Sequence, residues 1–83
     1  MPDPRRLHHT LHDLLGLIGR NTDRVGSMTV RGAMGAGVEG ALEVLLAMEL
    51  VELVEHRMSD DRPVAGVRIT EMGQLALQLP SVD

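Results

Sequence analysis

The chain contains no Phe, Tyr, Trp or Cys among its 83 residues, and this absence constrains the fold more than any other feature of the sequence. A chain of this length can build one small hydrophobic core. Without aromatic rings, that core has to be packed from Leu, Val, Ile and Met side chains. Without cysteine, disulfides, thiolate catalysis and the common zinc ribbons are excluded. We therefore expect one domain over residues 1–83, with a structured core over about residues 4–79 and a tail at 80–83.

The same absence narrows the classes of partner. Proteins that bind single-stranded nucleic acid stack bases on aromatic rings, and this chain has no such ring. No apolar run approaches the roughly 20 residues that a membrane-spanning helix needs. The segment MPDPRRLHHT (1–10) is charged and polar where a secretory signal would be apolar. We expect a cytoplasmic protein that binds neither membranes nor single-stranded nucleic acid.

Apolar spacing and turn residues divide the chain into short helices and strands. Leu and Ile recur every three to four residues near the start, which indicates an amphipathic helix, and Thr29 and Thr70 stand where N-caps of later helices are expected. The predicted order is a helix at 4–20, a polar loop at 21–27, a short strand within 27–30, a helix ending at 34, a turn at 35–37, a helix at 38–48, a strand at 50–57, a loop at 58–66, a strand at 67–70, and a helix from 71 that stops at Pro80.

The two later strands are predicted to form a hairpin. A two-stranded hairpin is marginally stable in water, so it has to pack on the helices, which gives an α+β fold. In the helix predicted at 38–48, Val38, Leu42 and Leu45 lie one turn apart and are expected to face the core.

Three stretches of the sequence resemble the winged helix-turn-helix domain of bacterial and archaeal transcriptional regulators. MTVRGAMGAGVEGALEVLLAMELVEL (28–53) resembles its second and third helices with a tight glycine turn between them. VRITEMGQLAL (67–77) resembles the second wing strand and the closing helix, and SDDRPVAG (59–66) lies where the wing tip belongs. The likeness, over about residues 7–79, implies a winged helix: a three-helix helix-turn-helix core, a two-stranded β-hairpin wing and a C-terminal helix.

In that family the third helix enters the major groove of DNA, and its outward side chains contact bases and phosphates. The corresponding positions here, which we call the third-helix surface, are Glu39, Gly40, Glu43, Val44, Leu46 and Ala47. Residues 38–56 hold five glutamates and no Arg or Lys, so this surface would repel phosphates. Exposed aliphatic side chains between glutamates suit a protein contact instead. Glu49 stands where the family usually has a helix-ending glycine, so an unstrained left-handed cap is lost.

The leading hypothesis is a non-catalytic winged-helix regulatory module that binds a protein partner or associates with itself as a homodimer. One alternative is that the acidic third helix is simply a solvated face. A second is a small regulator that binds double-stranded DNA through wing and N-terminal arginines. The candidate contacts to the DNA backbone are Arg24, Arg31, Arg57, Arg62 and Arg68.

Metal binding and catalysis find little support in the sequence. His8 and His12 lie one helical turn apart, but two histidines make half a metal site and no further ligand is close in sequence. The glycines of RGAMGAG (31–37) do not form a phosphate-binding loop, because the chain has no lysine. No nucleophile stands with an evident base and orienting group. We expect no metal, no cofactor and no enzymatic activity.

Overall fold

The computed structural model describes the backbone of residues 4–78 and the side chains of residues 11–78. Its elements are α1 (Pro4–Val25), β1 (Met28–Thr29), α2 (Val30–Ala36), α3 (Ala41–Ala47), β2 (Val51–Arg57), β3 (Pro63–Ile69) and α4 (Glu71–Gln78). Over this range the chain forms a small α+β fold of four helices and one three-stranded antiparallel sheet. The predicted order of helices and strands is confirmed. The predicted helix stop at Pro80 and the tail at 80–83 lie outside the described residues.

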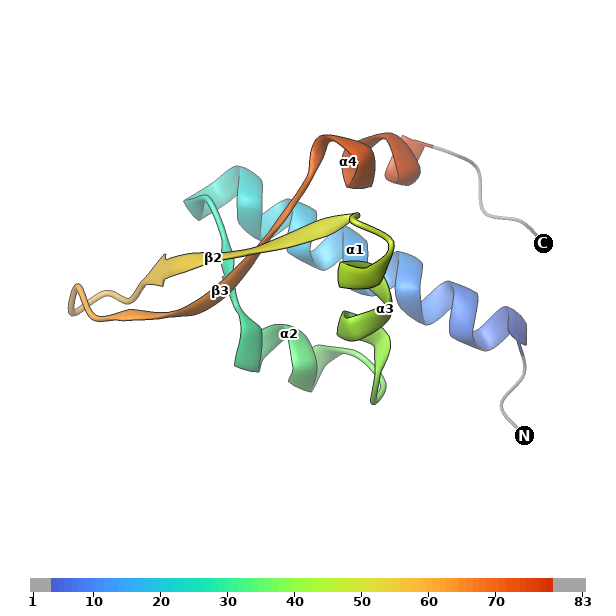
Figure 1. The fold of residues 1–83 in the computed structure, drawn as a ribbon, viewed down its shortest axis with the longest axis horizontal. Helices are drawn as coiled ribbons and strands as arrows, with labels where there is room; N and C mark the ends of the chain where they lie inside the picture. The colour runs from blue at the N-terminus through green and yellow to red at the C-terminus, as the bar shows by residue number, and fades with distance from the viewer. Residues whose placement is uncertain (1–3, 79–83) are drawn as a thin grey trace.

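The sheet has the strand order β1-β3-β2, so β3 is the central strand. Val67 of β3 lies between Met28 of β1 and Leu53 of β2. The short first strand therefore joins the hairpin, and the sheet has three strands, whereas the sequence predicted pairing only between the two later strands. Figure 1 shows the turn end of the β2–β3 hairpin reaching away from the helices, while α1 crosses behind the base of the hairpin.

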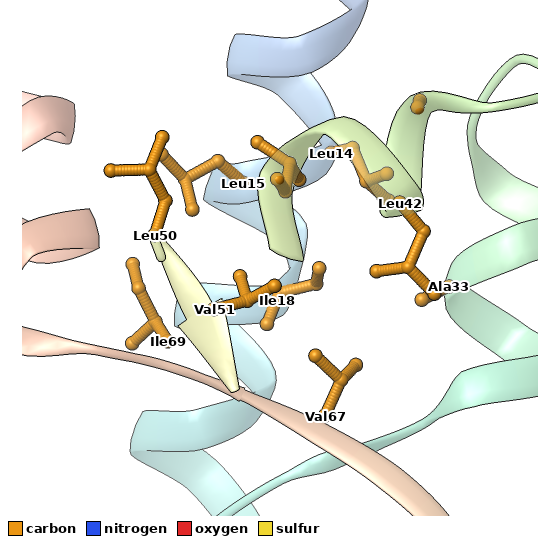
Figure 2. Close-up of a cluster of buried hydrophobic side chains, with 11 residues drawn as sticks. Leu14, Leu15, Ile18, Ala33, Leu42, Leu50, Val51, Val67 and Ile69 are labelled. Carbon is orange, nitrogen blue, oxygen red and sulfur yellow. The ribbon is translucent and has the colours of Figure 1, made fainter. Parts of the chain in front are cut away.

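An aliphatic core lies where α1, α2, α3 and the base of the sheet meet (Figure 2). Its buried residues are Leu14, Leu15, Ile18, Ala33, Ala41, Leu42, Leu45, Leu50, Val51, Val67 and Ile69. Ile18, Leu45 and Val67, from three different elements, are the largest side chains that are fully buried. Each large aliphatic side chain of this kind contributes about 1.5–3 kcal/mol relative to exposure. The core is aliphatic, as the composition requires.

Both predicted threonine caps are present. Thr29 Oγ1 accepts a hydrogen bond from the Gly32 N–H (3.0 Å), and Thr70 Oγ1 accepts one from the Gly73 N–H (3.1 Å). Each hydroxyl satisfies a backbone donor that has no partner inside its helix, and such a cap contributes about 1 kcal/mol. The Thr70 hydroxyl also donates to the Glu49 carbonyl oxygen (2.7 Å), so the cap of α4 is joined to the end of α3.

The prediction of a polar loop at 21–27 is wrong, because α1 continues to Val25. The polar side chains that suggested a loop are satisfied on the helix: Asn21 and Thr22 donate to the Leu17 and Ile18 carbonyl oxygens (2.9 and 2.8 Å). Thr22 Oγ1 also accepts from the Ile69 N–H of β3 (3.1 Å), which anchors this last part of the helix to the sheet.

The helix predicted at 38–48 is shorter, and α2 is longer than predicted, ending at Ala36. Gly40 has a φ of 86°, a left-handed conformation that no α-helix contains, so α3 begins only at Ala41. Leu42 and Leu45 are buried as predicted. The prediction for Val38 is wrong: it lies in the turn before α3 and is 49% exposed.

The loop predicted at 58–66 is also shorter, because β3 begins at Pro63. Proline is tolerated as the first residue of a strand, where its missing N–H costs little. Gly66, a residue type that is common in loops, pairs with Val54 on one side and Thr29 on the other. Pairing with both neighbouring strands overrides the weak strand propensity of glycine at this position.

Candidate interaction surfaces

The structure exposes five of the six residues of the third-helix surface. Glu39, Gly40, Glu43, Val44 and Ala47 are all exposed. Leu46 is the exception: it is half-buried and packs against the core. The reason is helical periodicity, because Leu46 follows the buried Leu42 by four residues and falls on the inner stripe of α3. Val44 remains the outward aliphatic residue, with 37% of its surface exposed.

Other apolar side chains extend this surface beyond the residues identified from the sequence. They are Met34 (54% exposed), Val38 (49%) and Met48 (54%). A hollow of about 320 Å³ lies at the turn between α2 and α3, lined by Met34, Val38, Glu39, Gly40, Leu42 and Glu43. Met34 was not among the surface residues predicted from the sequence, and it is exposed because α2 is only seven residues long and buries only Ala33. A helix this short leaves one side in solvent.

The three arginines of the hairpin are paired with carboxylates. The pairs are Arg57 with Glu55 (3.5 Å) and Asp61 (3.8 Å), Arg62 with Asp60 (2.6 Å), and Arg68 with Glu52. All these side chains are about half exposed or more, so each pair stabilises the fold by at most about 1 kcal/mol. Their larger effect is on the surface charge. Residues 51–69 hold three arginines and four carboxylates, so the hairpin presents no excess of positive charge.

Arg24 and Arg31 are exposed and form no ion pair within the part of the chain that the structure describes. Arg31 and Arg62 lie on one groove of about 820 Å³ between α2 and the hairpin. Apolar side chains line most of the rest of this groove, namely Val30, Met34, Met58, Val64 and Ala65. Of the five arginines identified from the sequence, only Arg31 and Arg62 line this groove.

His12 lines a different groove, of about 620 Å³, between α1 and α4, together with Asp13 and Arg20. The side chain of His8, its predicted companion, lies outside the described side chains. Among the residues that the structure describes, no three His, Cys, Asp or Glu side chains come close enough to hold a metal ion together.

A contact that the sequence did not reveal joins Ser27 Oγ to His56 Nδ1 at 2.7 Å. The two residues are 29 positions apart, and the bond joins the residue before β1 to the edge strand β2. A serine next to a histidine can be a nucleophile with its base. Here Ser27 is buried (6% exposed), and within residues 11–78 no carboxylate is hydrogen-bonded to His56. The bond ties the residue before β1 to the edge strand of the sheet.

Within residues 4–78, no helix has both the length and the apolar content needed to cross a membrane. Comparisons of the chain with protein-family models, with curated proteins and with solved structures found no match.

Proposed function

We propose that this chain is a winged helix-turn-helix module that acts by binding protein rather than by reading DNA, and that it is not an enzyme. The winged-helix assignment is supported by the chain order of the helices and strands together with the sheet order β1-β3-β2. In this interpretation α2 and α3 are the helix-turn-helix and the β2–β3 hairpin is the wing.

The observation that carries the proposal is the charge on the outward side of α3 and of the turn before it. Glu39 and Glu43 project from the surface that would face the DNA, and neither forms an ion pair within the described residues. Duplex DNA carries one negative charge per roughly 1.7 Å of its axis, so both glutamates would meet phosphates. Each close like-charge contact costs about 1 kcal/mol even in water. The hairpin provides no compensating positive charge, because its arginines are paired.

Binding to a protein is supported by the apolar side chains around these glutamates. Met34 and Val38, which line one hollow with Glu39 and Glu43, are about half exposed, and methionine is enriched at the cores of protein interfaces. Full burial of such a side chain is worth roughly 1.5–3 kcal/mol, and each has about half of that still to gain. The glutamates would then form the polar rim of the interface.

The direct test is binding to fluorescently labelled duplex DNA at low salt, measured by anisotropy. The wild-type protein is expected not to bind. The double variant Glu39→Arg plus Glu43→Arg is expected to gain weak, strongly salt-dependent binding, because new phosphate contacts release counterions. A charge-matched control, Asp13→Arg plus Asp23→Arg on α1, is expected to gain less. An equal gain of DNA binding in both double variants would show that the net charge of the protein, and not the position of the glutamates, controls DNA binding.

A small DNA-binding regulator is the second candidate, because Arg31 and Arg62 share a groove beside the hairpin. If the wild-type protein binds duplex DNA with a steep salt dependence, and Arg62→Ala plus Arg68→Ala abolishes that binding, the protein-binding proposal is wrong. If the Arg62→Ala plus Arg68→Ala variant still binds DNA, the binding is instead non-specific.

A further inference from the structure

Two hollows of opposite charge meet at Met34. On one side, the groove between α2 and the hairpin carries Arg31 and Arg62. On the other side, the hollow at the α2–α3 turn carries Glu39 and Glu43. Met34 lines both, so this surface has an apolar centre, a basic half and an acidic half.

A surface of this kind is complementary to itself. A two-fold axis through its centre places the basic half of the first copy against the acidic half of the second. On the other side of the axis, the acidic half of the first copy lies against the basic half of the second. We propose that a second copy of this chain docks here as a two-fold symmetric dimer, with Met34 of both copies at the axis and Arg31 of each copy facing Glu39 and Glu43 of the other. This inference rests on the proposed function and names its partner.

The charged groups needed for this dimer are available. Arg31, Glu39 and Glu43 are exposed, and none of them forms an ion pair within the described residues. Two equivalent sets of ion pairs can therefore form without breaking any of the ion pairs described within either copy. Arg62 keeps its pair with Asp60, so Arg31 supplies the unpaired positive charge of the basic half.

The apolar centre is suited to contact with the same region of a second copy of the chain. Met34 and Val38 are 54% and 49% exposed, and methionine has a flexible, polarisable side chain that packs well against an identical one. A head-to-tail arrangement would use the same charges but leave one acidic and one basic half free at the ends, so chains would grow. The two-fold arrangement satisfies both halves within a single dimer and closes.

The first experiment places a charge at the axis. Sedimentation equilibrium of the wild-type protein, recorded with interference optics because the chain lacks aromatic rings, is expected to show a monomer–dimer equilibrium between about 1 µM and 1 mM, the range for small interfaces. Met34→Glu brings two like charges together and is expected to abolish the dimer. Met72→Glu on α4 is the matched control, because Met72 is equally exposed (53% against 54% for Met34) and should leave the dimer unchanged. Far-UV circular dichroism verifies that each variant is folded.

The second experiment tests the symmetry. Arg31→Glu alone and Glu43→Arg alone are each expected to weaken the dimer about tenfold, because either change replaces the Arg31–Glu43 pair by a like-charge contact at two equivalent places. When the two variants are mixed, each site of the mixed dimer again holds one basic and two acidic side chains at positions 31, 39 and 43, as in the wild-type dimer. The mixture is therefore expected to associate about as tightly as the wild-type protein.

Three outcomes would overturn the inference: a wild-type chain that stays monomeric over the whole range, a Met34→Glu variant that dimerises as well as Met72→Glu, or growth into open oligomers. Failure here is distinguishable from failure of the proposed function. A strict monomer that also does not bind DNA removes only the second copy as partner, whereas salt-dependent binding to duplex DNA that is lost in Arg62→Ala plus Arg68→Ala removes the protein-binding function itself.

Discussion

Gly73, in the first turn of α4, packs against the carbonyl oxygen of Leu50 so closely that a Cβ at residue 73 would lie 2.1 Å from that oxygen. The same oxygen accepts a hydrogen bond from the Thr70 N–H (3.0 Å). Together with the bond from the Thr70 hydroxyl to Glu49, this contact fixes α4 against the segment that connects α3 to β2. The close approach of two backbones thus supports the helix that bears the third-helix surface.

Gly73→Ala is expected to lower the free energy of unfolding by about 2 kcal/mol or more, because the added methyl group must displace backbone atoms. Gly35→Ala is the matched control. Nothing lies within 4 Å of a Cβ at residue 35 on α2, so alanine should stabilise the protein there by about 0.5–1 kcal/mol through helix propensity. Urea unfolding followed by far-UV circular dichroism, at a concentration where the chain is monomeric, measures both. Equal stability of the wild-type protein and Gly73→Ala would contradict the close contact.

Glu49→Gly is expected to stabilise the protein by roughly 0.5–1 kcal/mol. Glu49 has a φ of 60°, and a left-handed conformation costs a residue with a side chain about 1–2 kcal/mol, partly offset by the greater freedom of glycine in the unfolded chain. Glu49→Gln removes the charge without relieving the backbone and should change stability little. The measurement is the shift in urea midpoint at constant slope. If Gln stabilises as much as Gly, charge rather than backbone strain is the cause.

Leu42→Ala and Val38→Ala are expected to differ sharply, although helical spacing alone places both residues in the core. Leu42 is 4% exposed, and its truncation should cost about 2–5 kcal/mol. Val38 is 49% exposed, and its truncation should lower the free energy of unfolding of the monomer by at most about 0.5 kcal/mol. Thermal or urea unfolding of the two variants measures this difference. A large loss of stability in Val38→Ala would indicate that α3 begins earlier than Ala41.

Ser27→Ala is expected to cost about 1–2 kcal/mol, because it leaves the half-buried His56 ring nitrogen without its partner. A double-mutant cycle with His56→Ala isolates the pair and should give a coupling of about 0.5–1.5 kcal/mol. Ser59→Ala, at an exposed position in the hairpin turn, is the control and should be neutral. A coupling near zero would mean that the two side chains do not stabilise one another.

Much of the fold and part of the candidate surface follow from local signals. The threonine caps and the buried Leu42 and Leu45 are set by neighbours within one or two helical turns, and so is the outward position of Glu43 on α3. The errors at the two predicted loops share one origin. Polar residues at the end of α1, and Pro63 and Gly66 in β3, have loop-like propensities that contacts with distant strands outweigh.

The sequence by itself determined an aliphatic core, the order of helices and strands, and an acidic block with no positive charge inside it. These depend only on residue type and on spacing along the chain. The tertiary structure decided that Ser27 reaches His56, that β1 pairs with β3, and that Arg62 shares a groove with Arg31 and Met34. Such meetings depend on how segments far apart in the chain pack, which no local propensity encodes.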